Sequence, residues 1–188
     1  MTEDIKKIRN QIDLLDKDIL ELLNKRAQEA VNISKEKQKS NEADNFYNPE
    51  REAQVMRRIK ELNKGPLSDQ SILKLFREIM SECLSLESPL RVSYLGPEGT
   101  YTHLASKNHF GNSILSKACI SVEDVFASVE KRDSHYGVVP VENSTQGIVS
   151  STLDMFMKSS LKISGEIEII VNHNILSKSE KLSDIKKI

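Results

Sequence analysis

Cysteine, net charge and long apolar runs are all scarce in this 188-residue chain, and each scarcity excludes a class of protein. The two cysteines, Cys83 and Cys119, stand alone without Cys-x-x-Cys spacing, which argues against a disulfide framework or a zinc site. Lys and Arg total 27 against 28 Asp and Glu, so no overall field attracts nucleic acid or anionic lipid. No segment reaches the roughly 20 apolar residues of a membrane span, and the charged N-terminal stretch does not form a signal peptide. We therefore expect a cytoplasmic protein with reduced thiols that binds neither nucleic acid nor membranes.

Spacings typical of metal ligands are also missing, so we expect no metal and no cofactor. The histidines are scattered along the chain and are assigned no chemistry: His103, His109, His135 and His173. Hydrophobic residues at 38% and charged residues at 29% are typical of a soluble globular protein. The length suffices for one large domain or two small ones.

Glycine and proline do not occur before residue 49, and this first stretch has a strict helical pattern. Its apolar residues alternate at intervals of three and four, which predicts one long helix with a coiled-coil-like seam: Ile5, Ile8, Ile12, Leu15, Ile19 and Leu22. A helix of about 40 residues is about 60 Å long, too long for two shorter helices to cover. We therefore expect self-association.

Two shorter helices follow. Asn48 can cap the first of them while Pro49 fills its first position, and Ser68 can cap the second after the Gly65-Pro66 break. Ser88-Pro89 ends the last helix. The pattern predicts an all-α domain of three helices over residues 1–87.

The pattern changes after a linker at residues 88–90. Strands and helices then alternate, which predicts a mostly parallel sheet with ligands at the carboxyl ends of its strands, in a second domain over residues 91–188. Strands are expected at 90–95, at Ile120 and at 136–141, helices at 102–110, 122–130 and 148–157, polar loops at 96–99 and 142–147, and an extended segment at 161–175. Residues 183–188 resemble the start of another helix, so this second domain is expected to be cut short.

A cation interrupts the long seam. Continuing the heptad past Leu22 places Arg26 where an apolar residue is due, and Lys37 lies about 16 Å further on and only about 20° around the helix. The two could bracket a small dianion, or they could extend to solvent from a frayed end of the seam. Arg9 lies about 25 Å from Arg26 and is rotated by about 100°, so it could reach the same ligand only from a second subunit.

The residues of these helices resemble the all-helical chorismate mutase family. The resemblance spans the first 87 residues through these segments: Ile8-Arg9, Leu14-Leu15-Asp16, Leu22-Leu23-Asn24-Lys25-Arg26, Lys35-Glu36-Lys37, Pro49-Glu50-Arg51-Glu52 and Leu75-Phe76-Arg77-Glu78-Ile79-Met80. It implies an intertwined homodimer that converts chorismate to prephenate. By resemblance Arg26, Arg51 and Lys37 bind the substrate, Arg9 reaches into the partner's pocket, and Glu52 accepts from the substrate hydroxyl. Asn48 stands where many members have Asp, although it could equally act only as a helix cap.

Glu87 stands where many members of that family carry Gln. It follows Cys83 by four residues, so both should point inward from the third helix, and both are assigned to the pocket. An ionised carboxylate cannot donate a hydrogen bond. Our hypothesis is that Glu87 is protonated and donates to the substrate ether oxygen, its pKa raised by burial and opposed by Lys37. The alternative is a solvated glutamate at a helix end.

The second half resembles the prephenate dehydratase family. Two motifs carry this resemblance: Gly96-Pro97-Glu98-Gly99-Thr100-Tyr101-Thr102 and Gly137-Val138-Val139-Pro140-Val141-Glu142-Asn143-Ser144-Thr145-Gln146-Gly147. It implies a periplasmic-binding-protein-like fold with the substrate between two lobes, one of them incomplete here. The polar residues expected to line that site are Thr100, Glu142, Asn143, Ser144 and Thr145.

Three functions remain open. The first is an active mutase joined to a partial dehydratase in phenylalanine biosynthesis. Because the family's Thr-Arg-Phe motif would follow residue 188, this option predicts little phenylpyruvate formation from prephenate. The second is a fully bifunctional enzyme whose missing lobe comes from another chain, and the third is a non-enzymatic dimerisation module with a ligand-binding lobe. Arg26 on the seam argues against the third.

Overall fold

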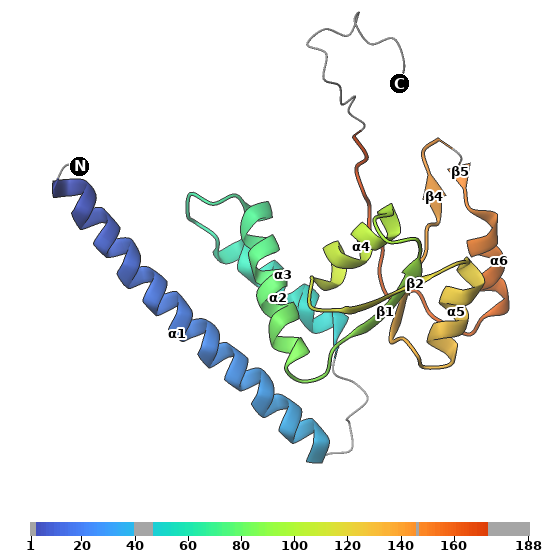
Figure 1. Ribbon diagram of the computed structural model, residues 1–188, viewed down its shortest axis with the longest axis horizontal. Helices are drawn as coiled ribbons and strands as arrows, with labels where there is room; N and C mark the ends of the chain where they lie inside the picture. The colour runs from blue at the N-terminus through green and yellow to red at the C-terminus, as the bar shows by residue number, and fades with distance from the viewer. Residues whose placement is uncertain (1–2, 40–46, 146, 173–188) are drawn as a thin grey trace, which may run out of the picture.

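The computed structural model describes residues 3–39, 47–145 and 147–172, which form a helical unit followed by an α/β unit (Figure 1). The helical unit contains α1 (Glu3–Lys39), α2 (Pro49–Leu62) and α3 (Asp69–Ser85). The three predicted helices are thus confirmed. Among the helices described, none has both the length and the apolar character that crossing a bilayer requires.

The predicted helix caps form as expected. The Arg51 backbone N–H donates to the Asn48 side chain at 2.9 Å, and Pro49 begins α2. The Ser71 backbone N–H donates to the Ser68 hydroxyl at 3.1 Å at the start of α3. Each cap satisfies an N–H group that has no acceptor within its own helix, so each fixes where a helix starts.

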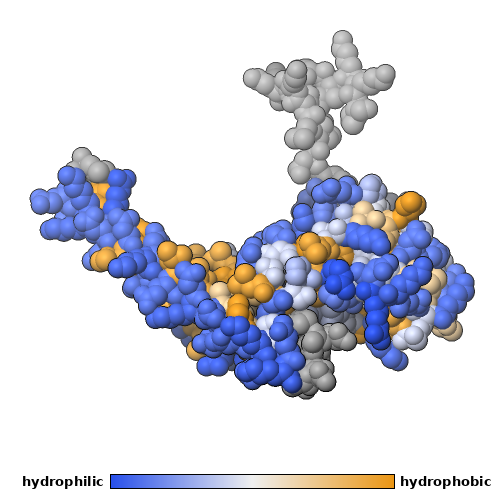
Figure 2. All heavy atoms as spheres, turned by 60° about the horizontal axis from the view of Figure 1, so that its bottom comes forward, coloured by the Kyte–Doolittle hydropathy of each residue, from blue (hydrophilic) through white to orange (hydrophobic). Residues whose placement is uncertain are grey.

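The N-terminal part of α1 projects away from the rest of the chain (Figure 1). The apolar seam of α1 is exposed. The helix packs against α3, as α2 does. Figure 2 shows hydrophobic residues distributed along this long helix. The large apolar side chains that remain exposed on it are Ile5, Ile8, Ile12, Leu14, Leu15, Ile19, Leu20, Leu22 and Ile33. A single chain therefore leaves the predicted seam uncovered.

The α/β unit is built on a three-stranded parallel sheet in the order β2-β1-β3. Its elements are β1 (Arg91–Leu95), α4 (Tyr101–Phe110), β2 (Leu115–Cys119), α5 (Val122–Glu130), β3 (Tyr136–Val138), β4 (Glu142–Asn143), β5 (Gly147–Ile148) and α6 (Ser150–Lys158). The expected parallel sheet is confirmed. Because β1 and β3 are parallel neighbours, the loops that follow them leave from the same edge of the sheet.

Apolar side chains of β1 and β3 meet those of α4 in the main core of this unit. The buried residues of this core are Leu90, Val92, Tyr94, Ala105, Phe110, Ile114 and Val138. Tyr47 and Leu84 from the helical unit pack against the same cluster. The two units therefore share a hydrophobic contact.

The turn after α4 docks directly on α3. Gly111 has φ +83°, and a Cβ there would lie 2.3 Å from the Ser81 Cβ, so only glycine allows this close approach. The Asn112 backbone N–H donates to a Glu78 carboxylate oxygen at 3.2 Å. Backbone contact thus joins the helical unit to the α/β unit.

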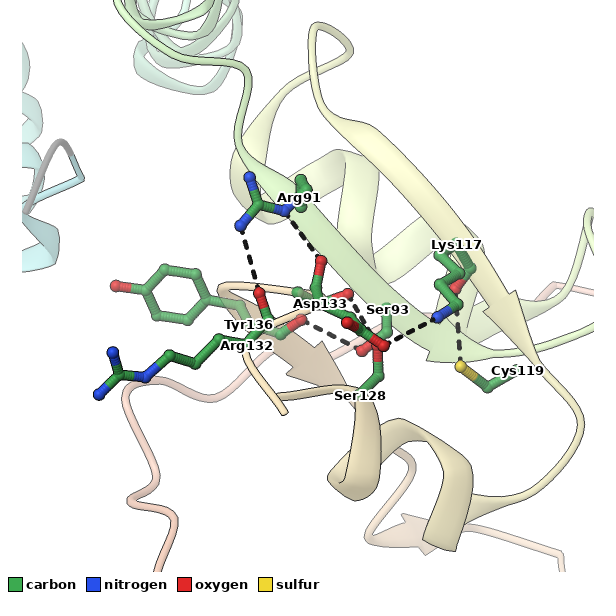
Figure 3. A network of polar contacts seen from close by, with 9 residues as sticks. Arg91, Ser93, Lys117, Cys119, Ser128, Arg132, Asp133 and Tyr136 are labelled. Atoms are coloured by element: carbon green, nitrogen blue, oxygen red, sulfur yellow. Dashed lines mark hydrogen bonds and ion pairs between the residues drawn. The ribbon is translucent and has the colours of Figure 1, made fainter. Parts of the chain in front are cut away.

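A polar network ties the three strands together at the start of β1 (Figure 3). The Arg91 guanidinium donates to the carbonyl oxygens of Asp133 at 2.8 Å and Arg132 at 3.3 Å. The Asp133 carboxylate lies 3.7 Å from the Lys117 ammonium on β2. These contacts fix the turn before β3 against the other two strands.

Several predicted elements differ from the structure. The strand expected at Ile120 is wrong, because β2 ends at Cys119 and Ile120 is 96% exposed. β2 is an edge strand whose residues are mostly exposed, so it lacks the apolar pattern of a buried strand. The strand expected to reach residue 141 stops at Val138, since Pro140 has no N–H for a ladder.

The region after β3 is also more ordered than expected. The short antiparallel pair β4 and β5 lies where a polar loop was predicted at 142–147 and extends to Ile148, and α6 starts two residues later than predicted. Residues 161–172 form no regular strand. The helix expected at 183–188, the end of the extended segment, and His173 lie outside the described residues.

Candidate active site

Two predicted cations of α1 lie against α3. The Arg26 guanidinium donates to the Ile79 carbonyl oxygen at 3.5 Å, and the Lys37 ammonium acts electrostatically on the Glu87 carboxyl. Both side chains are half-buried. Their separation of eleven positions corresponds to about 16 Å of helix. The structure thus brings Arg26, Lys37 and Glu87 to the side of α1 that meets α3.

Glu87 lies in a partly desolvated position just after α3. Burial raises the pKa of its carboxyl, and the positive charge of Lys37 opposes that rise. Its Oε2 atom is buried and has no hydrogen-bond partner among the described residues. A buried carboxyl oxygen without a partner favours the neutral acid, which can donate a hydrogen bond to a ligand. Cys83, one turn earlier on α3, is also buried.

Three predicted site residues lie at the N-terminus of α2, and their side chains make different contacts. The Asn48 side chain caps the helix. Arg51 is exposed, and its guanidinium donates to Gln54 of the same helix at 3.5 Å. Glu52 is half-buried and interacts with Tyr47 and Arg77. Among the described residues, Arg51 therefore contacts its own helix, and Glu52 contacts Tyr47 and α3.

Tyr47 and Arg77 are polar groups that the sequence analysis did not single out. The Tyr47 phenol hydrogen-bonds with the Glu52 carboxylate, and Arg77 acts on the same carboxylate from α3. Burial raises the pKa of Glu52, while the hydrogen bond and the arginine lower it. The Tyr47 contact had a local signal, since the residue before an N-cap commonly packs on the fourth residue of its helix. The Arg77 contact had none, because it joins two different helices.

Arg9 lies on the exposed N-terminal half of α1. The helix runs without interruption from Glu3 to Lys39, so the separation of about 25 Å between Arg9 and Arg26 holds along a single rigid element. The structure does not bring Arg9 to the other cations within one chain.

A second group of predicted residues lies at the carboxyl edge of the sheet. Thr100 is the N-cap of α4, where its hydroxyl accepts from the His103 N–H and lies 2.9 Å from the Pro97 carbonyl oxygen. The Gly99 N–H donates to His103 Nδ1 at 3.1 Å, and the His103 ring stacks on Tyr94 with centroids 4.6 Å apart. The loop after β1 is thus held by its own helix.

The loop after β3 carries the remaining four residues. Glu142, Asn143, Ser144 and Thr145 are all exposed, and the Thr145 N–H donates to the Asn143 side chain at 2.9 Å. Since the loops of β1 and β3 share one edge of the sheet, Thr100 and these four residues lie on the same side of the α/β unit. Hydroxyl and amide groups beside helix N-termini suit a carboxylate-bearing ligand.

Comparisons with known proteins match both units. Residues 8–88 match the family model of chorismate mutase type II, and residues 92–188 match that of prephenate dehydratase. A bifunctional chorismate mutase/prephenate dehydratase from Pseudomonas aeruginosa is 45% identical over 190 residues, which cover 99% of this chain and 52% of that protein. A protein of the same description from Neisseria gonorrhoeae is 48% identical, and the match covers 91% of this chain and 46% of that protein. Another from Escherichia coli K12 is 30% identical, and the match covers 96% of this chain and 51% of that protein. The chain spans about half the length of the curated relatives it matches.

Proposed function

Because the chain belongs to the prephenate dehydratase family and carries a chorismate mutase type II region ahead of the dehydratase region, we propose that its helical unit converts chorismate to prephenate. The observation that carries this proposal is the group formed by Arg26, Lys37 and the half-buried Glu87 carboxyl, where α1 meets α3. Consumption of chorismate by the purified chain, followed spectrophotometrically, tests it directly. Wild-type protein without turnover would refute it.

The reaction is a unimolecular rearrangement, so the site has two tasks. It holds the dianionic substrate in the folded conformer, and it stabilises negative charge that grows on the ether oxygen as the carbon–oxygen bond breaks. Arginine guanidinium groups bind the substrate carboxylates well, because they can donate two parallel hydrogen bonds to one carboxylate. In our proposal the substrate carboxylates are bound by Arg26, Arg51 and the partner's Arg9. Lys37 and protonated Glu87 face the ether oxygen, and Glu52 accepts from the substrate hydroxyl. Asn48 and Cys83 line the pocket.

The pocket requires a second subunit in this proposal. The uncovered seam of α1 supports a homodimer in which the long helices intertwine, because large apolar side chains on one stripe are stable when they are buried. Such a dimer would bring a second copy of Arg9 toward the first chain's α3, where Arg26 and Lys37 lie. It would also cover Ile12 and Leu15.

The protonation state of Glu87 leads to a pH prediction. Glu87→Gln keeps a donor at every pH, so kcat/KM of this variant should stay level where the wild-type value falls. The wild-type value should decline about tenfold per pH unit above the raised pKa of Glu87, because the ionised form cannot donate. A kcat/KM profile of both proteins measures this.

Glu82→Gln is the control, since Glu82 is an exposed carboxylate on α3, the helix that ends just before Glu87. It should keep the wild-type profile. A Glu87→Gln variant that still loses activity at high pH would rule out the acid role.

For the α/β unit we propose binding of prephenate at the carboxyl edge of the sheet, through Thr100, Glu142, Asn143, Ser144 and Thr145. The match of residues 92–188 to the prephenate dehydratase family supports this, as does the common edge of the two loops. The domain division at residues 88–90, a two-lobed periplasmic-binding-protein-like fold and a cytoplasmic place in phenylalanine biosynthesis belong to the same proposal. Binding of prephenate by equilibrium dialysis and formation of phenylpyruvate are separate readouts, and absence of binding would refute the site.

A further inference from the structure

Tyr47 occupies a special position relative to Glu52. Asn48 is the N-cap of α2, with extended backbone angles of φ −120° and ψ 97°, and Tyr47 precedes it. The residue before an N-cap meets the fourth residue of the helix, which here is Glu52. In most helices this pair is apolar. In this chain the pair is a phenol and a carboxylate joined by a hydrogen bond.

The Tyr47 ring is anchored in the α/β unit rather than in the helical unit. Its centroid lies 5.6 Å from that of Phe110 on α4 and 5.2 Å from that of Tyr136 on β3, with interplanar angles of 63° and 85°. Edge-to-face contacts of this kind stabilise a fixed ring orientation. The start of α2 is therefore held by the core of the neighbouring unit.

The charges around Glu52 come from three elements. Tyr47 precedes α2, Arg77 lies on α3, and His109 on α4 faces Arg77. Burial and the arginine lower the pKa of His109, so its ring is neutral near pH 7 and adds no second cation. Burial is the largest effect and raises the pKa of Glu52 above its ordinary value, whereas the phenol and Arg77 lower this pKa and favour the carboxylate. Tyr136 acts on Tyr47 and is not among the groups that act on Glu52.

We propose that Tyr47 is a positioning residue of the mutase, which uses its anchor in the α/β core to hold the Glu52 carboxylate in place as an acceptor for the substrate hydroxyl. The inference rests on the proposed role of Glu52 in that reaction. It gives the α/β unit a part in the mutase reaction, because Phe110 and Tyr136 fix the ring whose hydroxyl holds Glu52.

Tyr47→Phe tests the inference, since it keeps the ring and removes only the hydroxyl. KM for chorismate should rise about five- to tenfold while kcat changes less than about twofold, because the hydroxyl contact exists before and during the reaction. The acidic limb of the kcat/KM profile should move to higher pH, because loss of the hydrogen bond raises the pKa of Glu52. A role in packing alone would not move this limb.

Tyr101→Phe is the control, because it removes the hydroxyl of an exposed tyrosine on α4 that takes no part in the anchor of Tyr47. It should leave KM and the acidic limb unchanged. An active wild type with an unaltered Tyr47→Phe variant would overturn the inference, as would equal changes in both variants.

A second readout separates this inference from the proposed function. The carboxyl carbon of Glu52, labelled with ¹³C and assigned by its loss in Glu52→Gln, should titrate at higher pH in Tyr47→Phe than in wild type. That shift is measured whether or not chorismate reacts. An unchanged titration would overturn the inference that Tyr47 positions Glu52. An inactive wild type would instead overturn the mutase proposal.

Discussion

Arg26→Ala is expected to lower kcat/KM for chorismate about a hundred- to a thousandfold, which corresponds to about 3–4 kcal/mol of transition-state stabilisation. Arg26 replaces an apolar residue on the seam of α1 and is half-buried against α3. Loss of its guanidinium leaves a substrate carboxylate without its partner in a desolvated pocket. The assay is chorismate consumption, with the helix content followed by circular dichroism.

The helix content should not change in this variant, because alanine favours a helix and the hydrogen bond from Arg26 to α3 is long, at 3.5 Å. Arg58→Ala is the matched control, since Arg58 is an exposed cation on α2. Its activity should stay within about twofold of wild type. If Arg26→Ala lost no more activity than Arg58→Ala, the clamp would be disproved.

Charges on the exposed seam should separate the subunits and abolish turnover. In Ile12→Asp/Ile19→Asp, two residues of the seam that are at least half exposed in one chain become carboxylates. A dimer would lose four buried side chains, worth about 6–12 kcal/mol as an upper estimate. Sedimentation should show monomers, and kcat/KM should fall at least about a hundredfold because Arg9 no longer reaches the other chain.

Asn10→Asp/Lys17→Asp provides the control for this pair. It places two carboxylates at the same spacing of seven residues, but on the polar face of α1, and because Lys17 is a cation it makes the net charge one unit more negative than the seam pair does. It should remain dimeric and active. A seam variant that stayed dimeric, or that stayed active as a monomer, would contradict a pocket shared between subunits.

The helices could be predicted from the sequence because their signals are local. Asn48, Ser68 and Ser121 each precede a helix, and each accepts a backbone N–H within the next three residues. The capping box at Ser121 and Asp124 adds a reciprocal bond in the same turn. Such contacts depend only on neighbouring residues, so the starts of α2, α3 and α5 were expected within one residue.

The edge of the sheet could not be predicted in the same way. Strand β2 consists of Leu115, Ser116, Lys117, Ala118 and Cys119, and only the last is buried. Its identity as a strand comes from pairing with β1 rather than from its own pattern. Ile120 looked like a strand because it is apolar, yet it projects into solvent after the ladder ends.

In the candidate site, too, residues with a local sequence signal could be predicted, and contacts between distant segments could not. Arg26 was identified because a cation broke a regular apolar pattern, and the spacing to Lys37 followed from the helix repeat. The contact between Arg77 and Glu52 joins α3 to α2, and the anchor of Tyr47 joins α2 to α4 and β3. Contacts between distant segments leave no periodic trace in a single sequence, so these neighbours of Glu52 emerged only from the structure.

Mixing two inactive variants tests the shared cationic pocket most directly. Arg9→Ala and Arg26→Ala subunits, unfolded together and refolded in equal amounts, should regain about a quarter of the wild-type activity, because half of the dimers are mixed and each has one intact pocket. Recovery of that size would establish that Arg9 acts across the dimer. Activity no greater than the sum of the two separate variants would contradict it.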